Sequence, residues 1–132
     1  MRRDAYISCL AAVRHLNAAW WKVADQLSAR GSTPLDWQAA FVETHDAWAM
    51  FSAASSAVSV AGPRSAVDAA ADLHQAMRQW EMIGVEWARA AIRDGVAHVD
   101  DFHARFEAAA SAKQPPLAAF QQAAREVLST EH

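Results

Sequence analysis

Apolar side chains recur every three or four residues through most of the chain, which is the spacing that places them on one face of an α-helix. The first stripe is unbroken and consists of Tyr6, Cys9, Val13, Leu16, Trp20, Val23 and Leu27. The second consists of Trp37, Phe41, Thr44, Trp48, Phe51, Ser55 and Val58. The third consists of Ala66, Ala70, Leu73, Met77, Trp80, Gly84, Trp87 and Ala91. A fourth runs through Val99, Phe102, Phe106 and Ala109 and resumes at Phe120, Ala123 and Val127. The pattern predicts four helical segments.

Glycine and proline mark the ends of these segments. They cluster at Gly31 to Pro34, at Gly62-Pro63, at Gly95 and at Pro115-Pro116. Glycine is favoured just after a helix and proline in its first turn, so each cluster fits the end of one helix or the start of the next. Short turns between segments of similar length predict an all-α, up-down-up-down antiparallel four-helix bundle. We expect one domain over residues 1–132, with the fourth helix broken at Pro115-Pro116.

The composition adds a prediction about the core. Alanine makes up a quarter of the chain, and six tryptophans and five phenylalanines stand against few leucines on the stripes. Large aromatic side chains must therefore face alanines to reach the density of a protein interior. We expect closely spaced helices and a rigid core.

Charge and cysteine content exclude several classes of protein. The formal net charge is −3 and there are only two lysines, Lys22 and Lys113, so no basic stripe is available for nucleic acid. The single cysteine, Cys9, excludes a disulfide framework and a CxxC motif. No run of 18 apolar residues is present, so we expect no membrane span and a cytoplasmic protein.

A candidate site lies near mid-height in the predicted bundle. Gly84 occupies a core position between Trp80 and Trp87, although glycine inside a helix costs about 1 kcal/mol relative to alanine. Either an indole from another helix fills the space, or the space is an aromatic-walled pocket for a flat or apolar small molecule. The candidate ligand-binding residues are Trp20, Thr44, His45, Trp48, Trp80, Glu81 and Gly84.

His45 and Glu81 flank this level on neighbouring helices, where a histidine–carboxylate pair would suit acid–base chemistry. Whether the chain is an enzyme stays open. For metals, the nearest approach to a carboxylate-bridged site is Asp100-x-x-His103, which is also what a charged, solvated first turn looks like. We therefore expect no metal and no cofactor.

Two helices carry apolar residues beyond the core stripe. The third adds Met82, Val85, Ile92 and Val96, and the second adds Met50, Ala53, Ala57 and Val60. A second apolar face indicates a surface that another subunit covers. We therefore expect a homodimer through helices two and three and a self-associating helical binding or interaction module. The alternative is a small-molecule-binding bundle, or a small enzyme, that uses the mid-height pocket.

One segment resembles a known hairpin. Val58-Ser-Val-Ala-Gly-Pro63, followed by Val67, Ala70, Ala71 and Leu73, is similar to a helical hairpin of small uncharacterised all-helical proteins from actinobacteria. The resemblance implies a bacterial source and a tight turn between two helices, and it implies no activity or ligand.

Overall fold

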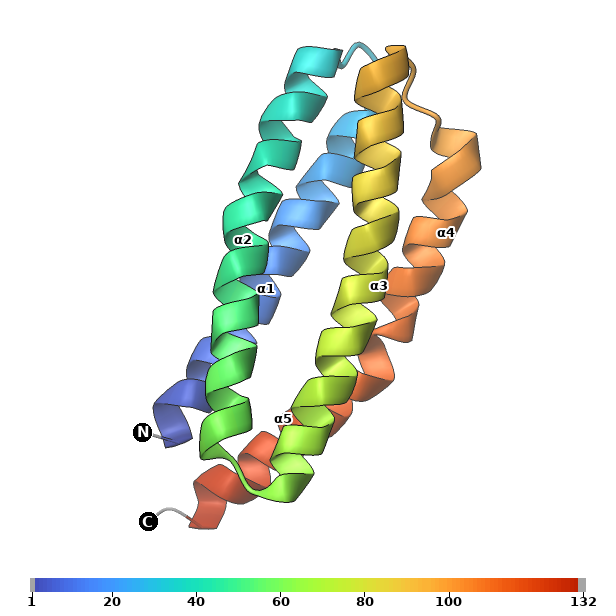
Figure 1. Ribbon diagram of the computed structural model, residues 1–132. Helices are drawn as coiled ribbons and strands as arrows, with labels where there is room; N and C mark the ends of the chain where they lie inside the picture. The colour runs from blue at the N-terminus through green and yellow to red at the C-terminus, as the bar shows by residue number, and fades with distance from the viewer. Residues whose placement is uncertain (1, 131–132) are drawn as a thin grey trace.

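The computed structural model describes residues 2–130 and is an antiparallel four-helix bundle (Figure 1). Within this range the helices are α1 (Arg2–Ser28), α2 (Pro34–Ala61), α3 (Arg64–Asp94), α4 (Val99–Ala112) and α5 (Gln114–Thr130), and there are no strands. α4 and α5 are separated by a single residue and form one bent arm, which runs antiparallel to α3. The predicted fold class is confirmed.

The helix ends follow the local chemistry of the turns. Thr33 caps α2: its hydroxyl accepts from the Asp36 N–H, and the Asp36 carboxylate accepts from the Thr33 N–H at 2.9 Å. Pro34 opens that helix, where no N–H is needed. At the end of α3, Gly95 takes a left-handed conformation with φ +70°, which glycine adopts without steric cost.

The core is aromatic and close to the predicted stripes. Every stripe member of α1 and α3 is buried, and so are Phe106 and Phe120 of the bent arm. The stripe of α2 is wrong at one point, because Trp48 is only half-buried. Its neighbour Ala47 is fully buried instead, so the buried face of α2 lies one residue away from the predicted stripe at this level.

The fourth helix bends at Lys113, two residues before the predicted break at Pro115-Pro116. Proline lacks an N–H and is tolerated in the first turn of a helix, where that group has no intrahelical partner. The two prolines therefore lie in the first turn of α5, and the residues before them must end α4.

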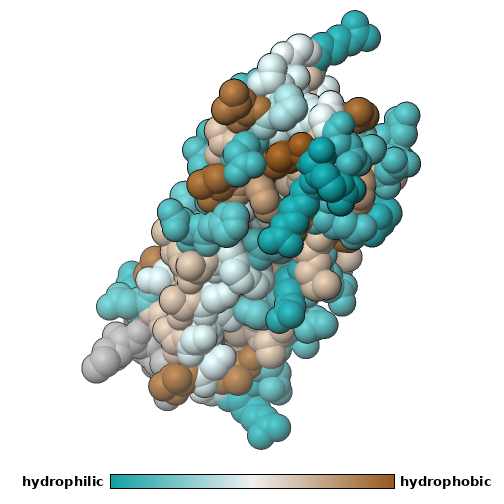
Figure 2. All heavy atoms as spheres, turned by 45° about the horizontal axis from the view of Figure 1, so that its top comes forward, coloured by the Kyte–Doolittle hydropathy of each residue, from teal (hydrophilic) through white to brown (hydrophobic). Residues whose placement is uncertain are grey.

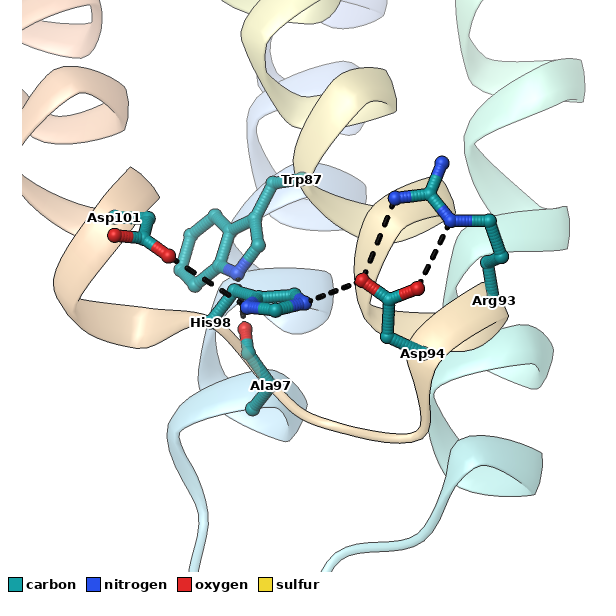
Figure 3. Close-up of polar contacts among 6 residues, drawn as sticks. All are labelled: Trp87, Arg93, Asp94, Ala97, His98 and Asp101. Carbon is teal, nitrogen blue, oxygen red and sulfur yellow. Dashed lines mark hydrogen bonds and ion pairs between the residues drawn. The ribbon is translucent and has the colours of Figure 1, made fainter.

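A polar network closes the turn between α3 and α4 (Figure 3). Trp87 of α3 donates its indole N–H to the Ala97 carbonyl at 2.6 Å. His98 adopts a left-handed conformation with φ +51°, and its ring lies 2.8 Å from the Asp94 carboxylate. Asp94 also accepts from Arg93, and these two hydrogen bonds lower the pKa of Asp94 to about 2. The network fixes where α4 begins relative to α3.

Candidate functional site

Gly84 is in contact with Trp20, which extends from α1 into the space left by the missing side chain. A Cβ atom at Gly84 would lie 2.5 Å from Cζ3 and 2.6 Å from Cε3 of the indole. These distances are far shorter than van der Waals contact. The first of the two interpretations of Gly84 therefore describes this position: an indole from another helix fills it.

Trp20 is held on several sides. Its ring lies 6.1 Å from that of Phe41 and 6.3 Å from that of Phe106, centroid to centroid. Its indole N–H donates to Glu81 Oε1 at 3.3 Å. Burial raises the pKa of Glu81 to about 7, although the hydrogen bond from Trp20 acts in the opposite direction. The carboxyl group thus titrates near neutral pH at the edge of the core.

Phe106 of α4 is the centre of this aromatic cluster. Four tryptophans contact its ring: Trp20 and Trp21 of α1 and Trp80 and Trp87 of α3, at centroid distances of 6.3, 5.3, 5.1 and 5.5 Å. Edge-to-face and tilted arrangements such as these are the favourable ones for aromatic pairs. The cluster joins three of the four helical arms at mid-height.

The other predicted site residues lie outside this cluster. Thr44 is buried, and its hydroxyl donates to the Phe41 carbonyl of its own helix at 2.6 Å. His45 is exposed, with its ring 3.3 Å from the Val42 carbonyl. Trp48 packs against His74 at 5.4 Å. The structure pairs Glu81 with Trp20 and leaves His45 on the surface, so the histidine–carboxylate pair considered from the sequence does not form.

Lys113 is a buried charged residue that the stripe pattern does not single out. Only 3% of it is exposed, and its Nζ donates to Asn17 Oδ1 at 2.7 Å and lies 3.2 Å from the centroid of the Trp80 ring. Burial lowers its pKa to about 8. One signal was present in the sequence, since Lys113 is one of only two lysines and directly precedes Gln114-Pro115-Pro116.

An open groove of about 830 Å³ runs along the outer face of α3. The α3 residues that line it include Arg78, Met82, Val85, Glu86, Arg89 and Arg93, and Trp48 of α2 and Phe102 of α4 flank them. Met82 is 59% exposed. In Figure 2, exposed apolar side chains lie singly or in small groups among hydrophilic ones. In the groove along α3, the apolar side chains of Met82 and Val85 also lie between charged side chains.

Comparisons with known proteins give no family for this chain. No family model matches it, and no curated protein or solved structure is similar to it. The resemblance of the Gly62-Pro63 hairpin to actinobacterial proteins therefore stays a prediction. None of the helices within residues 2–130 combines the length and the hydrophobicity that a membrane span requires. The same range holds no group of three or more histidine, cysteine or acidic side chains arranged for a metal ion.

Proposed function

We propose that the protein is a self-associating helical module and that two copies pair through the groove on α3. One observation carries the proposal: two charged residues of this face, one basic and one acidic, lie at equal distances along the helix on either side of an exposed methionine. Arg78 stands four residues before Met82, and Glu86 stands four residues after it. All three side chains are exposed and line the groove.

Two-fold symmetry turns this pattern into an interface. If two copies of α3 pack antiparallel with Met82 opposite Met82, then Arg78 of each copy faces Glu86 of the other. The pairing forms two identical ion pairs on either side of an apolar centre. Methionine suits such a centre because its unbranched, polarizable side chain adapts to the surface it meets. Trp48 and Phe102 extend the apolar area toward α2 and α4.

Sedimentation velocity over a concentration series tests the proposal. We expect the wild type to dimerise at micromolar concentration and Met82→Glu to weaken dimerisation by on the order of 100-fold, because the variant brings two carboxylates together at the symmetry axis. Met50→Glu is the matched control, because Met50 belongs to the apolar face predicted on the second helix, which the proposed pairing does not use. Met50 is a methionine of similar exposure, 50%, on α2, and it does not line the groove. A wild type that stays monomeric at high micromolar concentration, or equal effects of the two variants, would refute the pairing.

Charge exchange tests the register. Arg78→Glu alone should weaken the dimer, since it places like charges opposite each other, and Arg78→Glu combined with Glu86→Arg should recover much of the loss. Arg105, whose guanidinium lies 3.5 Å from the Glu86 carboxylate of its own chain, is changed to Gln in all variants to keep the comparison even. A double variant no tighter than the single one would exclude this register.

The small-molecule alternative finds no support at the predicted residues. The space at Gly84 is occupied by Trp20, and Thr44 and His45 are engaged by carbonyls of their own helix. We therefore advance no second function for the mid-height residues.

A further inference from the structure

Lys113 lies at the joint between α4 and α5 and faces inward. Its neighbours Ala112 and Gln114 are exposed, so the bend places this one side chain in the interior. A long lysine side chain ordinarily keeps its ammonium group in water. Here the Nζ atom lies over the indole of Trp80 instead.

The polar surroundings of the amine are sparse. An ammonium group carries three hydrogens to donate, and the acceptor found within residues 2–130 is Asn17 Oδ1 at 2.7 Å. The face of the Trp80 ring attracts a cation but takes no conventional hydrogen bond. The Trp80 N–H is itself buried without a partner in this part of the chain. The Lys113 ammonium group and the Trp80 N–H therefore have more hydrogens to donate than the described residues around them accept.

An open hollow of about 240 Å³, referred to below as the cavity, lies at this joint, and both Lys113 and its hydrogen-bond partner Asn17 are among the residues that line it. Lys113 and Asn17 form part of its wall, Trp21 gives an aromatic side, and Glu107 and Ser111 add polar groups near the exposed rim. Cavities of this size hold only small molecules. The combination of an interior amine, an aromatic wall and a few polar groups is typical of a site that binds a compact polar compound.

We propose that Lys113 forms an imine with a small aldehyde or ketone that enters this cavity. The lone pair of the neutral amine attacks the carbonyl carbon and forms a C–N bond, while one amine proton moves to the carbonyl oxygen. The resulting carbinolamine then loses its hydroxyl group together with the second N–H proton as water, which leaves a C=N bond. Glu107 is the acidic residue among those that line the cavity, and its Oε1 lies 3.3 Å from His103 Nε2, so an acid–base pair is present at the rim for these proton transfers. A protonated imine keeps its positive charge over the Trp80 ring, as the ammonium does.

The protonation state agrees with this role. With the pKa of Lys113 lowered to about 8, about one amine in ten is neutral at pH 7. For a lysine of ordinary pKa the neutral fraction is below about one in a thousand. Only the neutral form attacks a carbonyl.

Reductive trapping tests the proposal, with glycolaldehyde as the probe and cyanoborohydride as the reductant of the imine. The sequence contains only one other lysine, Lys22, which is exposed and paired with Glu43 at 3.0 Å, so each molecule carries its own reference. Peptide mass spectrometry of the folded protein at pH 7 should show Lys113 trapped on the order of tenfold faster than Lys22, because burial of the amine offsets part of the advantage that its larger neutral fraction gives. The rate at Lys113 should also saturate with glycolaldehyde concentration.

Ser111→Phe gives a second test, because Ser111 is exposed and lines the cavity, so a larger side chain obstructs it without entering the core. We expect several-fold slower trapping at Lys113 and no change at Lys22. Trapping of Lys113 that is slower than that of Lys22, or that needs urea, would overturn the proposal. Fast trapping that Ser111→Phe leaves unchanged would overturn the assignment of the cavity.

Discussion

Gly84 shows how a single missing side chain organises the bundle. It is the one glycine within α3, and the edge of the Trp20 ring occupies the space where a Cβ would be. Trp20 has little freedom to retreat, because it contacts Phe41 and Phe106 and donates to Glu81. The glycine therefore permits a close approach of α1 to α3 rather than an opening between them.

Gly84→Ala should destabilise the protein. Alanine gains up to about 1 kcal/mol of helix propensity, but overpacking against a confined ring costs about 1 to 3 kcal/mol. Gly84→Leu should be clearly worse. Urea denaturation of both variants measures the loss in the free energy of unfolding. Combining Gly84→Ala with Trp20→Phe should recover part of it, since the smaller ring leaves room for the methyl group. Melting temperatures above that of the parent in both single variants would mean that the position is open.

The sequence predicts only part of the site, and the contacts of Glu81 and Lys113 show where the prediction ends. Helical periodicity identified which residues face inward, and Trp20, Trp80 and Gly84 do meet or lie buried at one level. Periodicity does not specify which atom of one helix meets which atom of another, because that depends on the rotation of each helix and on side-chain rotamers. For this reason Glu81 meets Trp20 rather than His45, and the buried Lys113 went unpredicted.

At the level of the helices, sequence signals placed the ends accurately where a specific residue is required. The left-handed backbone at the end of α3 favours glycine, and the start of α2 needs a capping side chain. Gly95 and Thr33 meet these requirements, and both lie where the turns were predicted. The break in the fourth helix was shifted, because prolines begin a helix as readily as they end one. The left-handed conformation of His98 could not be predicted from the residue type, because it is uncommon for residues other than glycine. The contact with Asp94 holds the residue in this conformation.

The hydrogen bond from Trp87 in the turn between α3 and α4 leads to a prediction about the stability of the first turn of α4. Trp87→Phe keeps an aromatic ring in a fully buried position but removes the donor to the Ala97 carbonyl and some of the indole volume. We expect the free energy of unfolding to fall by about 2 to 4 kcal/mol, the combined cost of the lost hydrogen bond and of the space left by the smaller ring. Amide hydrogen exchange should become faster in the first turn of α4 more than in α5. Uniformly faster exchange along both helices would show that the turn does not position α4 locally.

For the molecule as a whole, two ionisable groups make stability depend on pH: the half-buried Glu81 and the buried Lys113. The pKa of Glu81 is raised from 4.5 to about 7 in the folded state. Between these values the folded protein holds a proton that the unfolded chain has lost, so Glu81 makes stability fall as pH rises through this window. The pKa of Lys113 is lowered from 10.5 to about 8, so between pH 8 and 10.5 the unfolded chain holds the extra proton and stability rises with pH.

Two variants isolate these contributions to stability. The pKa values of Cys9 and His74 are also shifted, but both residues are present in the wild type and in each variant, so their contributions cancel in the comparison. Relative to the wild type, Glu81→Gln should gain stability as pH increases from about 4.5 to 7. Lys113→Met should be more stable than the wild type at pH 7, and its advantage should shrink between pH 8 and 10.5. Urea denaturation at pH 5, 7, 8 and 10 measures both differences. A difference from wild type that does not change with pH would show that the group is not perturbed by folding.

The close packing of four indole rings around Phe106 also affects the fluorescence and circular dichroism of these tryptophans. Trp20, Trp21, Trp80 and Trp87 share one neighbouring ring, and the rings of Trp21 and Trp80 lie 5.8 Å apart. At such separations the electronic transitions of neighbouring chromophores couple, and excitation passes between them before it is emitted. The fluorescence and near-ultraviolet circular dichroism of these four tryptophans therefore belong to the cluster and not to the individual rings, and Trp37 and Trp48 add separate contributions. Replacing Phe106, which is not itself an indole, would alter the tryptophan spectrum while leaving every tryptophan in the chain.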